Sequence, residues 1–140
     1  TRVAKSASKI MKNGGSFLTL TYVGSNKTTP NYNVMGVAKA ALETSVKYLS
    51  VDLGKNNIRV NAISAGPMKT IAGAAISGAR HVYRYSEKVA PLKKNPDLQQ
   101  VGNAAVYLLS DISSGVTGLT HYVDGGLKVV GIPNQDLVNV

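Results

Sequence analysis

Tyr32-Asn33-Val34-Met35-Gly36-Val37-Ala38-Lys39 opens a long helical segment and fixes how the chain around it is organised. Seven helical residues turn through about 700°, so Tyr32 and Lys39 leave the helix within roughly 20° of the same face. An ammonium beside a phenol favours the phenolate, and the pair therefore predicts a tyrosine that can donate a proton. Gly36 lies between them on that face and leaves room for a ligand. The alternative is a tyrosine flanking a helix and a solvated lysine, and the neighbouring motifs decide between the two.

The segments on both sides of this stretch predict a strand–helix–strand unit. Residues 33–54 are expected to form one helix, and residues 16–23 and 58–64 read as strands buried in a parallel sheet. This order predicts a right-handed parallel crossover. Ala65-Gly66-Pro67 ends the second strand at its carboxyl end, where open parallel sheets bind ligands. The helix is expected to bury one stripe of apolar side chains, namely Val34, Ala38, Ala41, Leu42, Leu49 and Leu53.

Two further segments are expected to be helical. Residues 1–12 read as the end of a helix, closed by a glycine cap at Asn13-Gly14-Gly15. Residues 71–91 begin with small side chains and continue with charge and tyrosine, which predicts two short helices around a mobile joint.

The last third of the chain is expected to add a helix and a strand. The helix runs from Pro96, with Asn95 as its N-cap, to about Asp111. Residues 119–123 predict the strand, and Asp124-Gly125-Gly126 permits a tight turn and the close approach of another backbone. The sequence shows no internal repeat and no domain linker.

The composition argues against several functional classes. The chain has 140 residues, 44% hydrophobic and 16% charged, which suits one globular domain or a part of one. It holds no cysteine, and its two histidines, His81 and His121, lie far apart, so no disulfide, thiol nucleophile or metal site is expected. The sequence has no run of about 18 apolar residues, so a membrane span is not expected. Because the chain begins at Thr1 inside what reads as a helix, we expect a piece of a longer or processed protein.

The charge is strongly positive. With 16 Lys+Arg against 7 Asp+Glu the formal net charge is +9, which attracts anions such as nucleic acid, a nucleotide cofactor or an acidic protein. The chain has no long basic run, no aromatic residues interleaved with Arg and no zinc module, which are the usual marks of nucleic-acid binding. A non-catalytic anion- or nucleic-acid-binding module stays open as a remote alternative.

Four motifs, in this order and spacing, resemble the enoyl-[acyl-carrier-protein] reductases, a divergent family of the short-chain dehydrogenase/reductase superfamily. The Tyr-x6-Lys spacing distinguishes the enoyl reductases from ordinary members of the superfamily, which have Tyr-x3-Lys. In this chain the fourth position after Tyr32 is Gly36, not lysine. A tyrosine, Tyr22, ten positions before Tyr32 is also the enoyl reductase pattern. The motifs are Leu18-Thr19-Leu20-Thr21-Tyr22, Pro30 to Lys39, Arg59 to Pro67, and Val123-Asp124-Gly125-Gly126.

The resemblance implies an α/β fold, a Rossmann-like doubly wound parallel sheet. Residues 1–140 would be the C-terminal part of a single reductase domain, with the N-terminal dinucleotide-binding half absent from this chain. The implied reaction reduces the trans-2 double bond of enoyl-acyl-carrier-protein with NADH, or NADPH. The implied partners are the acidic carrier protein, the N-terminal half and three further copies in a homotetramer, whose interface includes the Asp124-Gly125-Gly126 region. The implied location is the bacterial cytoplasm or the plastid stroma.

The resemblance also assigns roles to single residues. Tyr32 would stabilise the enolate oxygen, Lys39 would hold the nicotinamide ribose, and Tyr22 would line the acyl site or assist through its hydroxyl. The nicotinamide end of the cofactor would be wrapped by Met68, Lys69, Thr70, Ile71 and Ala72. Ala72 and Ile76 would contact substrate, within a mobile substrate-covering segment at about residues 70–90.

The remaining polar and aromatic residues form two groups, a basic cluster with two possible roles and a set of rings expected only to pack. The basic cluster Arg80, Arg84, Lys88, Lys93 and Lys94 is either a solvated face or a docking site for the carrier protein. Packing alone is expected for His81, Tyr83, Tyr85, Tyr107, His121 and Tyr122.

The nearest alternative function is a 3-oxoacyl or other carbonyl reductase of the same superfamily. The Tyr22/Tyr32/Lys39 spacing argues against it. Because a dinucleotide fold needs the first strand and its glycine-rich turn, we expect this segment alone to be inactive and aggregation-prone.

Overall fold

The three strands form one parallel sheet in the order β1-β2-β3. The computed structural model describes residues 1–71 and 77–137. Strand β1 (Gly15–Thr21) pairs along its whole length with β2 (Ile58–Ala65), and the last four residues of β2 pair with β3 (Thr120–Val123). The predicted parallel pairing of the first two strands is confirmed.

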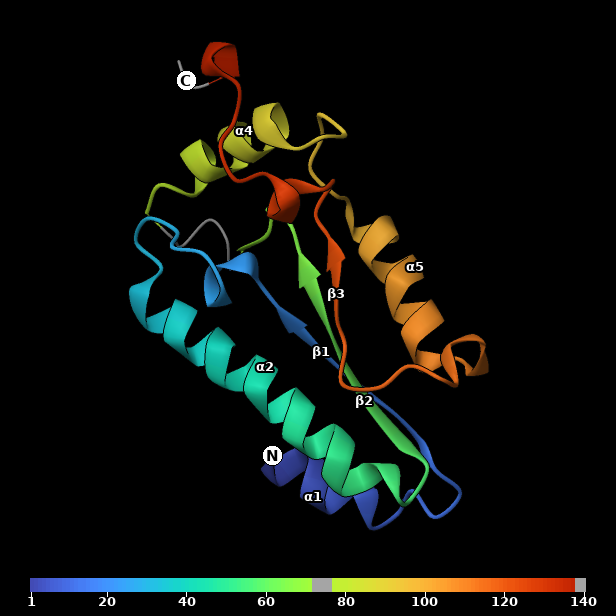
Figure 1. The fold of residues 1–140 in the computed structure, drawn as a ribbon. Coiled ribbons are helices and arrows are strands. Elements are labelled where there is room, and N and C mark those ends of the chain that lie inside the picture. Colours follow the sequence, from blue (N-terminus) through green and yellow to red (C-terminus); the bar gives the residue numbers. More distant parts are fainter. Residues whose placement is uncertain (72–76, 138–140) are drawn as a thin grey trace.

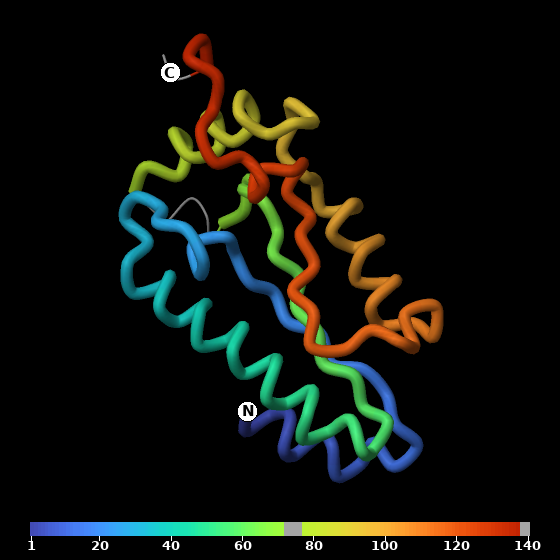
Figure 2. The backbone as a smooth tube through the Cα atoms, in the orientation of Figure 1, coloured from blue at the N-terminus to red at the C-terminus, as the bar shows by residue number. Residues whose placement is uncertain are grey.

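Helices cover both faces of this sheet. Helix α2 (Asn33–Gly54) lies on one face and α5 (Leu98–Leu109) on the other, as Figure 1 shows. Helix α2 has the predicted bounds. Shorter elements complete the described chain: α1 (Arg2–Ser8), α4 (Ala79–Val89), η1 (Val23–Ser25), η2 (Asp111–Ser113), η3 (Leu127–Val129) and η4 (Gln135–Leu137). In the tube of Figure 2 the N-terminus and η4, the last described element, lie at opposite ends of the molecule.

Strand β2 is the centre of the core, because it is buried between the two neighbouring strands and the two helices. On one side Val46 of α2 packs with Val60 and Ala62, and on the other Ile63 packs with Val101 and Leu108 of α5. Each fully buried Val, Leu or Ile side chain stabilises the fold by about 1.5–3 kcal/mol.

The stripe predicted for α2 is wrong in part. Leu42, Leu49 and Leu53 are half-buried, but Val34 is 82% exposed, and Ala38 and Ala41 are exposed as well. The helix instead buries Val46 and the carboxylate of Glu43. The apolar side chains of this helix are divided between the face on the sheet and the outer face, so sequence spacing alone did not separate the two.

Strand β1 is less buried than predicted. Phe17 and Leu18 are half-buried and Leu20 is 53% exposed, because β1 is an edge strand of this sheet and has a neighbour on one side only. The strand also ends at Thr21, so Tyr22 and Val23 belong to the turn that follows it.

Two predicted helix caps are wrong. Helix α1 ends at Ser8, and Gly14, with φ +83°, instead lies against the backbone of Asn57 at the entry to β1. The N-cap of α5 is Asp97, not Asn95, because its carboxylate accepts the Gln100 backbone N–H while the Gln100 side chain accepts the Asp97 N–H. Pro96 therefore precedes the cap, and the helix ends at Leu109.

Candidate active site

Two tyrosines meet at the carboxyl end of the sheet. Tyr22 is the N-cap of η1, directly after β1, and Tyr32 is the N-cap of α2. Their ring centroids lie 5.1 Å apart with the planes at 68°, an edge-to-face contact. The Tyr32 hydroxyl has no hydrogen-bond partner in the described part of the chain. Every fully enclosed side-chain polar atom there has a partner, so the Tyr32 hydroxyl is not fully enclosed. The pair therefore offers a phenol O–H to a ligand.

Glycines bring the turn of η1 against the start of α2. A Cβ atom at Gly24 would lie 2.6 Å from the Tyr32 ring, and one at Gly36 would lie 2.8 Å from the Gly24 carbonyl oxygen. The space at Gly36 is thus taken by the backbone of Gly24, and the prediction that it leaves room for a ligand is wrong. These glycines set the close packing that fixes the Tyr32 ring.

Lys39 lies two turns into α2 and points toward β1. Its Nζ donates to the backbone carbonyl of Leu20 at 3.0 Å. Tyr32 has φ −116° and ψ 12°, so it precedes the regular helix and the predicted 700° rotation does not apply to it. The two residues reach the same end of the sheet because the cap directs the Tyr32 ring onto the turn that follows β1.

Burial controls the acidity of both phenols. Desolvation raises the pKa of Tyr32 above its ordinary value, opposite to the lowering expected from Lys39. Desolvation also raises the pKa of Tyr22, with a smaller raise from Tyr32, and a hydrogen bond with Thr29 opposes the shift. Both phenols are proton donors at neutral pH.

A buried carboxylate that was not predicted from the sequence lies near this pair. Glu43 on α2 is 8% exposed and accepts hydrogen bonds from Thr21, Ser25 and Asn26, all in the turn that carries Tyr22. The available signal was that Glu43 is the only acidic residue in the first 19 residues of the helix.

The segment after β2 borders an open cleft of about 840 Å³. Met68, Lys69 and Thr70 line it, Arg80 and Arg84 line its other side, and Lys69 Nζ lies 5.1 Å from the Tyr83 ring centroid. Ile71 is 94% exposed. The predicted contacts of Ala72 and Ile76, and most of the first predicted short helix, lie outside the described residues. The second predicted helix is α4.

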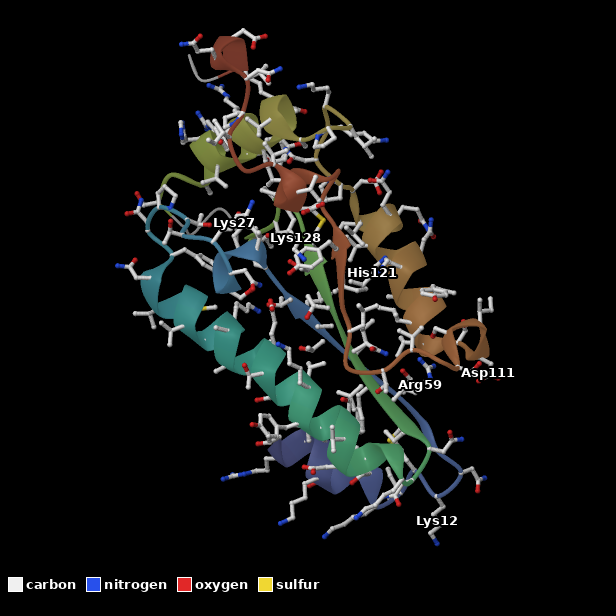
Figure 3. All side chains as sticks on the ribbon, viewed as in Figure 1. Lys12, Lys27, Arg59, Asp111, His121 and Lys128 are labelled. Atoms are coloured by element: carbon white, nitrogen blue, oxygen red, sulfur yellow. The ribbon has the colours of Figure 1, made fainter. Side chains whose placement is uncertain are left out.

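A second cleft, of about 360 Å³, adjoins Tyr22. It is lined by Tyr22, His81, Tyr85, Val89 and Val130 among others, and the His81 and Tyr85 rings stack at 6.5 Å. Lys27 closes one side, because its Nζ donates to the carbonyls of Lys128 and Val130 at 2.7 and 2.9 Å (Figure 3). The lining of this cleft is therefore a mixture of aromatic, apolar and polar side chains beside the tyrosine pair.

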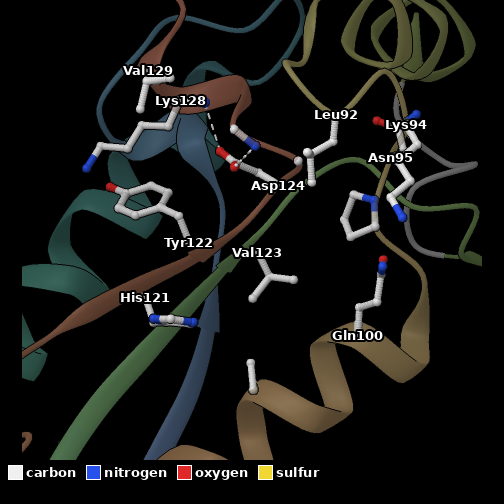
Figure 4. Close-up of a pocket in the computed structure, with 14 residues that line it drawn as sticks. Leu92, Lys94, Asn95, Gln100, His121, Tyr122, Val123, Asp124, Lys128 and Val129 are labelled. Carbon is white, nitrogen blue, oxygen red and sulfur yellow. Dashed lines mark hydrogen bonds between the residues drawn. The ribbon is translucent and has the colours of Figure 1, made fainter.

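The Asp124-Gly125-Gly126 turn lines a third cleft, drawn in Figure 4. The buried Asp124 carboxylate accepts the N–H groups of Gly126 and Lys128, and Lys128 Nζ lies 3.7 Å from the Tyr122 ring centroid. A Cβ at Gly125 would lie 2.6 Å from the Lys94 carbonyl oxygen. The predicted tight turn with a close backbone is confirmed, and Tyr122 packs as expected.

Two classes of site are not seen in the described residues. No three His, Asp or Glu side chains in residues 1–71 and 77–137 are grouped so that they could hold a metal ion. No helix of that part of the chain combines the length and apolar character needed to span a membrane.

A parallel sheet with helices on both faces, and with a tyrosine pair and a lysine at its carboxyl end, is an arrangement that fits a Rossmann-type fold. The chain belongs to the enoyl-(acyl carrier protein) reductase family, whose sequence model matches residues 1–128.

Curated relatives and solved structures agree with this assignment. Enoyl-[acyl-carrier-protein] reductase [NADH] 1 of Rhizobium meliloti (strain 1021) is 56% identical over 140 residues, which are 100% of this chain and 52% of the relative. The crystal structure of FabI from Candidatus Liberibacter asiaticus superposes with a TM-score of 0.91 at 51% identity, over 94% of this chain and 51% of that one. The enoyl-(acyl-carrier-protein) reductase of Anaplasma phagocytophilum in complex with NAD gives a TM-score of 0.89 at 55% identity, over 94% and 50% of the two chains. The chain thus spans about half the length of the relatives it matches.

Proposed function

We propose that this chain is the C-terminal half of an NADH-dependent enoyl-[acyl-carrier-protein] reductase. Such an enzyme reduces the trans-2 double bond of an enoyl thioester in the last step of the fatty acid elongation cycle. The main support for this proposal is that the Tyr22 and Tyr32 ring centroids lie 5.1 Å apart at the carboxyl end of a parallel sheet, with Lys39 on the following helix. The NADH named for the relatives supports the cofactor.

Tyr32 stabilises the charge that develops during the reaction. A reduced nicotinamide, when bound, supplies a hydride to the β-carbon of the enoyl thioester. The C=C π electrons move toward the thioester oxygen as an enolate, and a proton taken up at the α-carbon completes the reduction. The Tyr32 hydroxyl donates a hydrogen bond to that oxygen, where an interaction strengthens as the reaction proceeds. Its raised pKa keeps the hydroxyl protonated for this role.

The chain's own residues fit a nicotinamide cofactor. Lys39 donates one hydrogen bond, to Leu20, so an ammonium with three N–H groups has donors left for ribose hydroxyls. Met68, Lys69 and Thr70 line the open cleft at the carboxyl end of β2, where a Rossmann-type sheet binds its cofactor. We assign the nicotinamide end to these residues together with Ile71 and Ala72.

Tyr22 and the smaller cleft take the acyl chain in this proposal. The cleft combines the Tyr22 ring with apolar side chains such as Val89 and Val130. Ala72 and Ile76 are proposed to cover the substrate, within a mobile segment at about residues 70–90 of a single reductase domain. Their small or apolar side chains are the support for that role.

The acidic carrier protein is the proposed partner beside this site. Arg80, Arg84 and Lys88 are exposed and spaced four residues apart on α4, so they share one helix face beside the larger cleft. Charge reversal, Arg80→Glu with Arg84→Glu, should raise the KM for carrier-linked substrate by about tenfold and leave the KM for the coenzyme A thioester nearly unchanged. Lys12→Glu, at the other end of the molecule in Figure 3, is the matched control. Equal effects on both substrates would leave the cluster a solvated face.

A homotetramer is the proposed assembly. The outer face of α2 presents exposed apolar side chains at heptad spacing: Val34 (82%), Val37 (73%), Tyr48 (71%) and Val51 (78%). Burying this face against a second copy would remove an apolar stripe from water. Sedimentation of Val37→Glu and Tyr48→Glu variants tests the assembly, and variants that remain tetramers would exclude this face as its interface. The proposed location is the bacterial cytoplasm or the plastid stroma, where carrier-linked fatty acid synthesis takes place.

The deciding experiment uses the longer reductase that carries this chain. Its turnover is followed at 340 nm with crotonyl and acetoacetyl thioesters, using NADH and NADPH in parallel. Oxidation of NADH with crotonyl thioester supports the proposal, whereas activity on acetoacetyl thioester alone moves the assignment to the 3-oxoacyl reductases. The isolated 140-residue chain serves as the control and is expected to be inactive, because it spans about half the length of the reductases it matches. Turnover by that chain alone would contradict this expectation.

A further inference from the structure

Glu43 is a buried carboxylate whose hydrogen bonds all come from one short segment. Its Oε1 accepts from Thr21 Oγ1 at 2.8 Å and from Ser25 Oγ, and its Oε2 accepts from Asn26 Nδ2 at 3.1 Å. The three donors lie within six residues of one another, between the last residue of β1 and the residue after η1. No ion pair to Glu43 occurs in the described part of the chain.

Burial of the Glu43 carboxylate destabilises the fold unless its three hydrogen bonds are kept. A carboxylate that is 8% exposed loses most of its hydration, and three neutral donors must compensate for that loss. Hydrogen bonds to a charged acceptor are stronger than those between neutral groups, so moving the turn away from Glu43 is strongly unfavourable. The carboxylate therefore fixes the backbone between Thr21 and Asn26 relative to α2.

The backbone between Thr21 and Asn26 positions the tyrosine pair. Tyr22 and Gly24 lie inside the segment, the Tyr22 ring contacts the Tyr32 ring, and a Cβ at Gly24 would lie 2.6 Å from the Tyr32 ring. We propose that Glu43 is a positioning residue, whose carboxylate holds the Thr21–Asn26 turn so that Tyr22 and Tyr32 present their hydroxyls to the substrate. The inference rests on the proposed function for what the two hydroxyls do.

The side chains around Glu43 also separate positioning from cofactor binding. Lys39 contacts the Leu20 carbonyl, which lies before the segment that Glu43 holds. Loss of the Glu43 hydrogen bonds should therefore disturb the tyrosines and leave the lysine in place. The expected signature is a fall in kcat with the Kd for NADH unchanged.

The test compares Glu43→Gln with Asp52→Asn in the longer reductase. Both changes neutralise one carboxylate on α2, but Asp52 is exposed near the end of the helix. A glutamine keeps one acceptor oxygen and places an N–H₂ group opposite the Asn26 amide. We expect kcat on crotonyl thioester to fall about tenfold, with KM and the Kd for NADH changed less than about twofold, because small misplacements of catalytic groups cost rate before binding. Asp52→Asn should leave kcat unchanged.

Removing the donors should reproduce the effect. Thr21→Val combined with Ser25→Ala takes away the two hydroxyls on Oε1, and adding Glu43→Gln to that pair should lower kcat little further. Additive losses would show that Glu43 acts elsewhere, and would overturn the inference.

A readout independent of turnover separates this inference from the proposed function. 3-Fluorotyrosine placed at position 22 or 32 gives a fluorine resonance that reports the ring environment. Glu43→Gln should move both resonances and Asp52→Asn neither. Unmoved resonances, or moved resonances with unchanged kcat, would overturn the positioning role. If the unsubstituted enzyme fails to reduce enoyl thioesters, the proposed function fails, while the resonances still decide whether Glu43 holds the tyrosines.

Discussion

The two ends of strand β2 use polar side chains in opposite ways. At its amino end, the Arg59 guanidinium donates to the carbonyls of Leu108 and Ser110 and to the Ser113 hydroxyl at 2.8–3.0 Å. The fully buried Asn61 donates to the Val116 carbonyl and accepts from Leu119 N. At the carboxyl end, the Tyr32 hydroxyl has no partner among the described residues and Lys39 uses one of its donors.

The difference separates stability from chemistry. Arg59 donates to backbone carbonyls at the end of α5, which also accept from Ser16 and Ser113, so its hydrogen bonds are completed within the fold. Tyr32 and Lys39 keep hydrogen-bonding capacity that the described residues leave unused. In Figure 3 Arg59 lies toward the end of the sheet opposite Lys27, which lines the smaller cleft beside Tyr22.

Tyr32→Phe should give the largest effect and should act on rate alone. In the proposed reaction the change removes one donor to the enolate oxygen, for which kcat losses of about 10²- to 10³-fold are typical. The unfolding midpoint should stay the same, since the hydroxyl has no partner within the described fold. Steady-state kinetics with a thermal melt of the longer reductase measures both, and a large loss of stability would erase the contrast between the ends.

Arg59→Met should give the opposite result. The variant removes the guanidinium's hydrogen bonds to the Leu108 and Ser110 carbonyls, although Ser16 and Ser113 still donate to them, and it should lower the free energy of unfolding by about 2 kcal/mol. Well below the melting temperature kcat should be unchanged. Urea denaturation gives the free energy, and Arg59→Lys, which keeps the charge but loses the fork geometry, shows how much the geometry contributes.

Gly24→Ala sharpens the comparison at the catalytic end. The added methyl group would lie 2.6 Å from the Tyr32 ring, so the ring must shift. We expect kcat to fall about tenfold through misplacement of the hydroxyl. Gly54→Ala is the control, because a Cβ there meets nothing within 4 Å. Equal rates for both variants would contradict the close packing described here.

Asp97→Ala tests whether the carboxyl end also holds purely structural groups. It removes the capping box at the start of α5 and should cost about 1 kcal/mol of unfolding free energy. The rate should not change, because Asp97 does not contact the tyrosines. Urea denaturation and kinetics of this variant beside Gln99→Ala, on the exposed side of the same turn, separate the cap from the helix.

The smallest effect concerns alkaline pH. The folded-state pKa of Tyr32 lies above its ordinary value of 10.0, so its contribution to stability is fully present below pH 10 and is lost as pH rises through the folded pKa. Stability of the unsubstituted reductase should therefore fall more steeply above pH 10 than that of Tyr32→Phe. Urea titrations at several pH values compare the slopes, and parallel slopes would show that burial does not control this phenol.

The comparison also shows how much could be predicted from the sequence. The bounds of α2, the parallel pairing of β1 with β2 and the residues of the tyrosine–lysine set follow from periodicity, turn residues and motif spacing, which are local properties. The cap of α5 was mistaken because Asn95, Pro96 and Asp97 all carry cap signals, and only the reciprocal bond with Gln100 selects Asp97.

What the tertiary structure alone decided is how distant segments meet. The sequence by itself determined which residues are the candidates for the chemistry, since their types and spacing are local properties of the chain. It did not determine that Gly36 receives the Gly24 backbone, that burial raises the pKa of both tyrosines, or that Glu43 binds the turn carrying Tyr22. Each of these depends on groups separated along the chain and brought into contact by packing, and desolvation and hydrogen bonding act only at such contact distances.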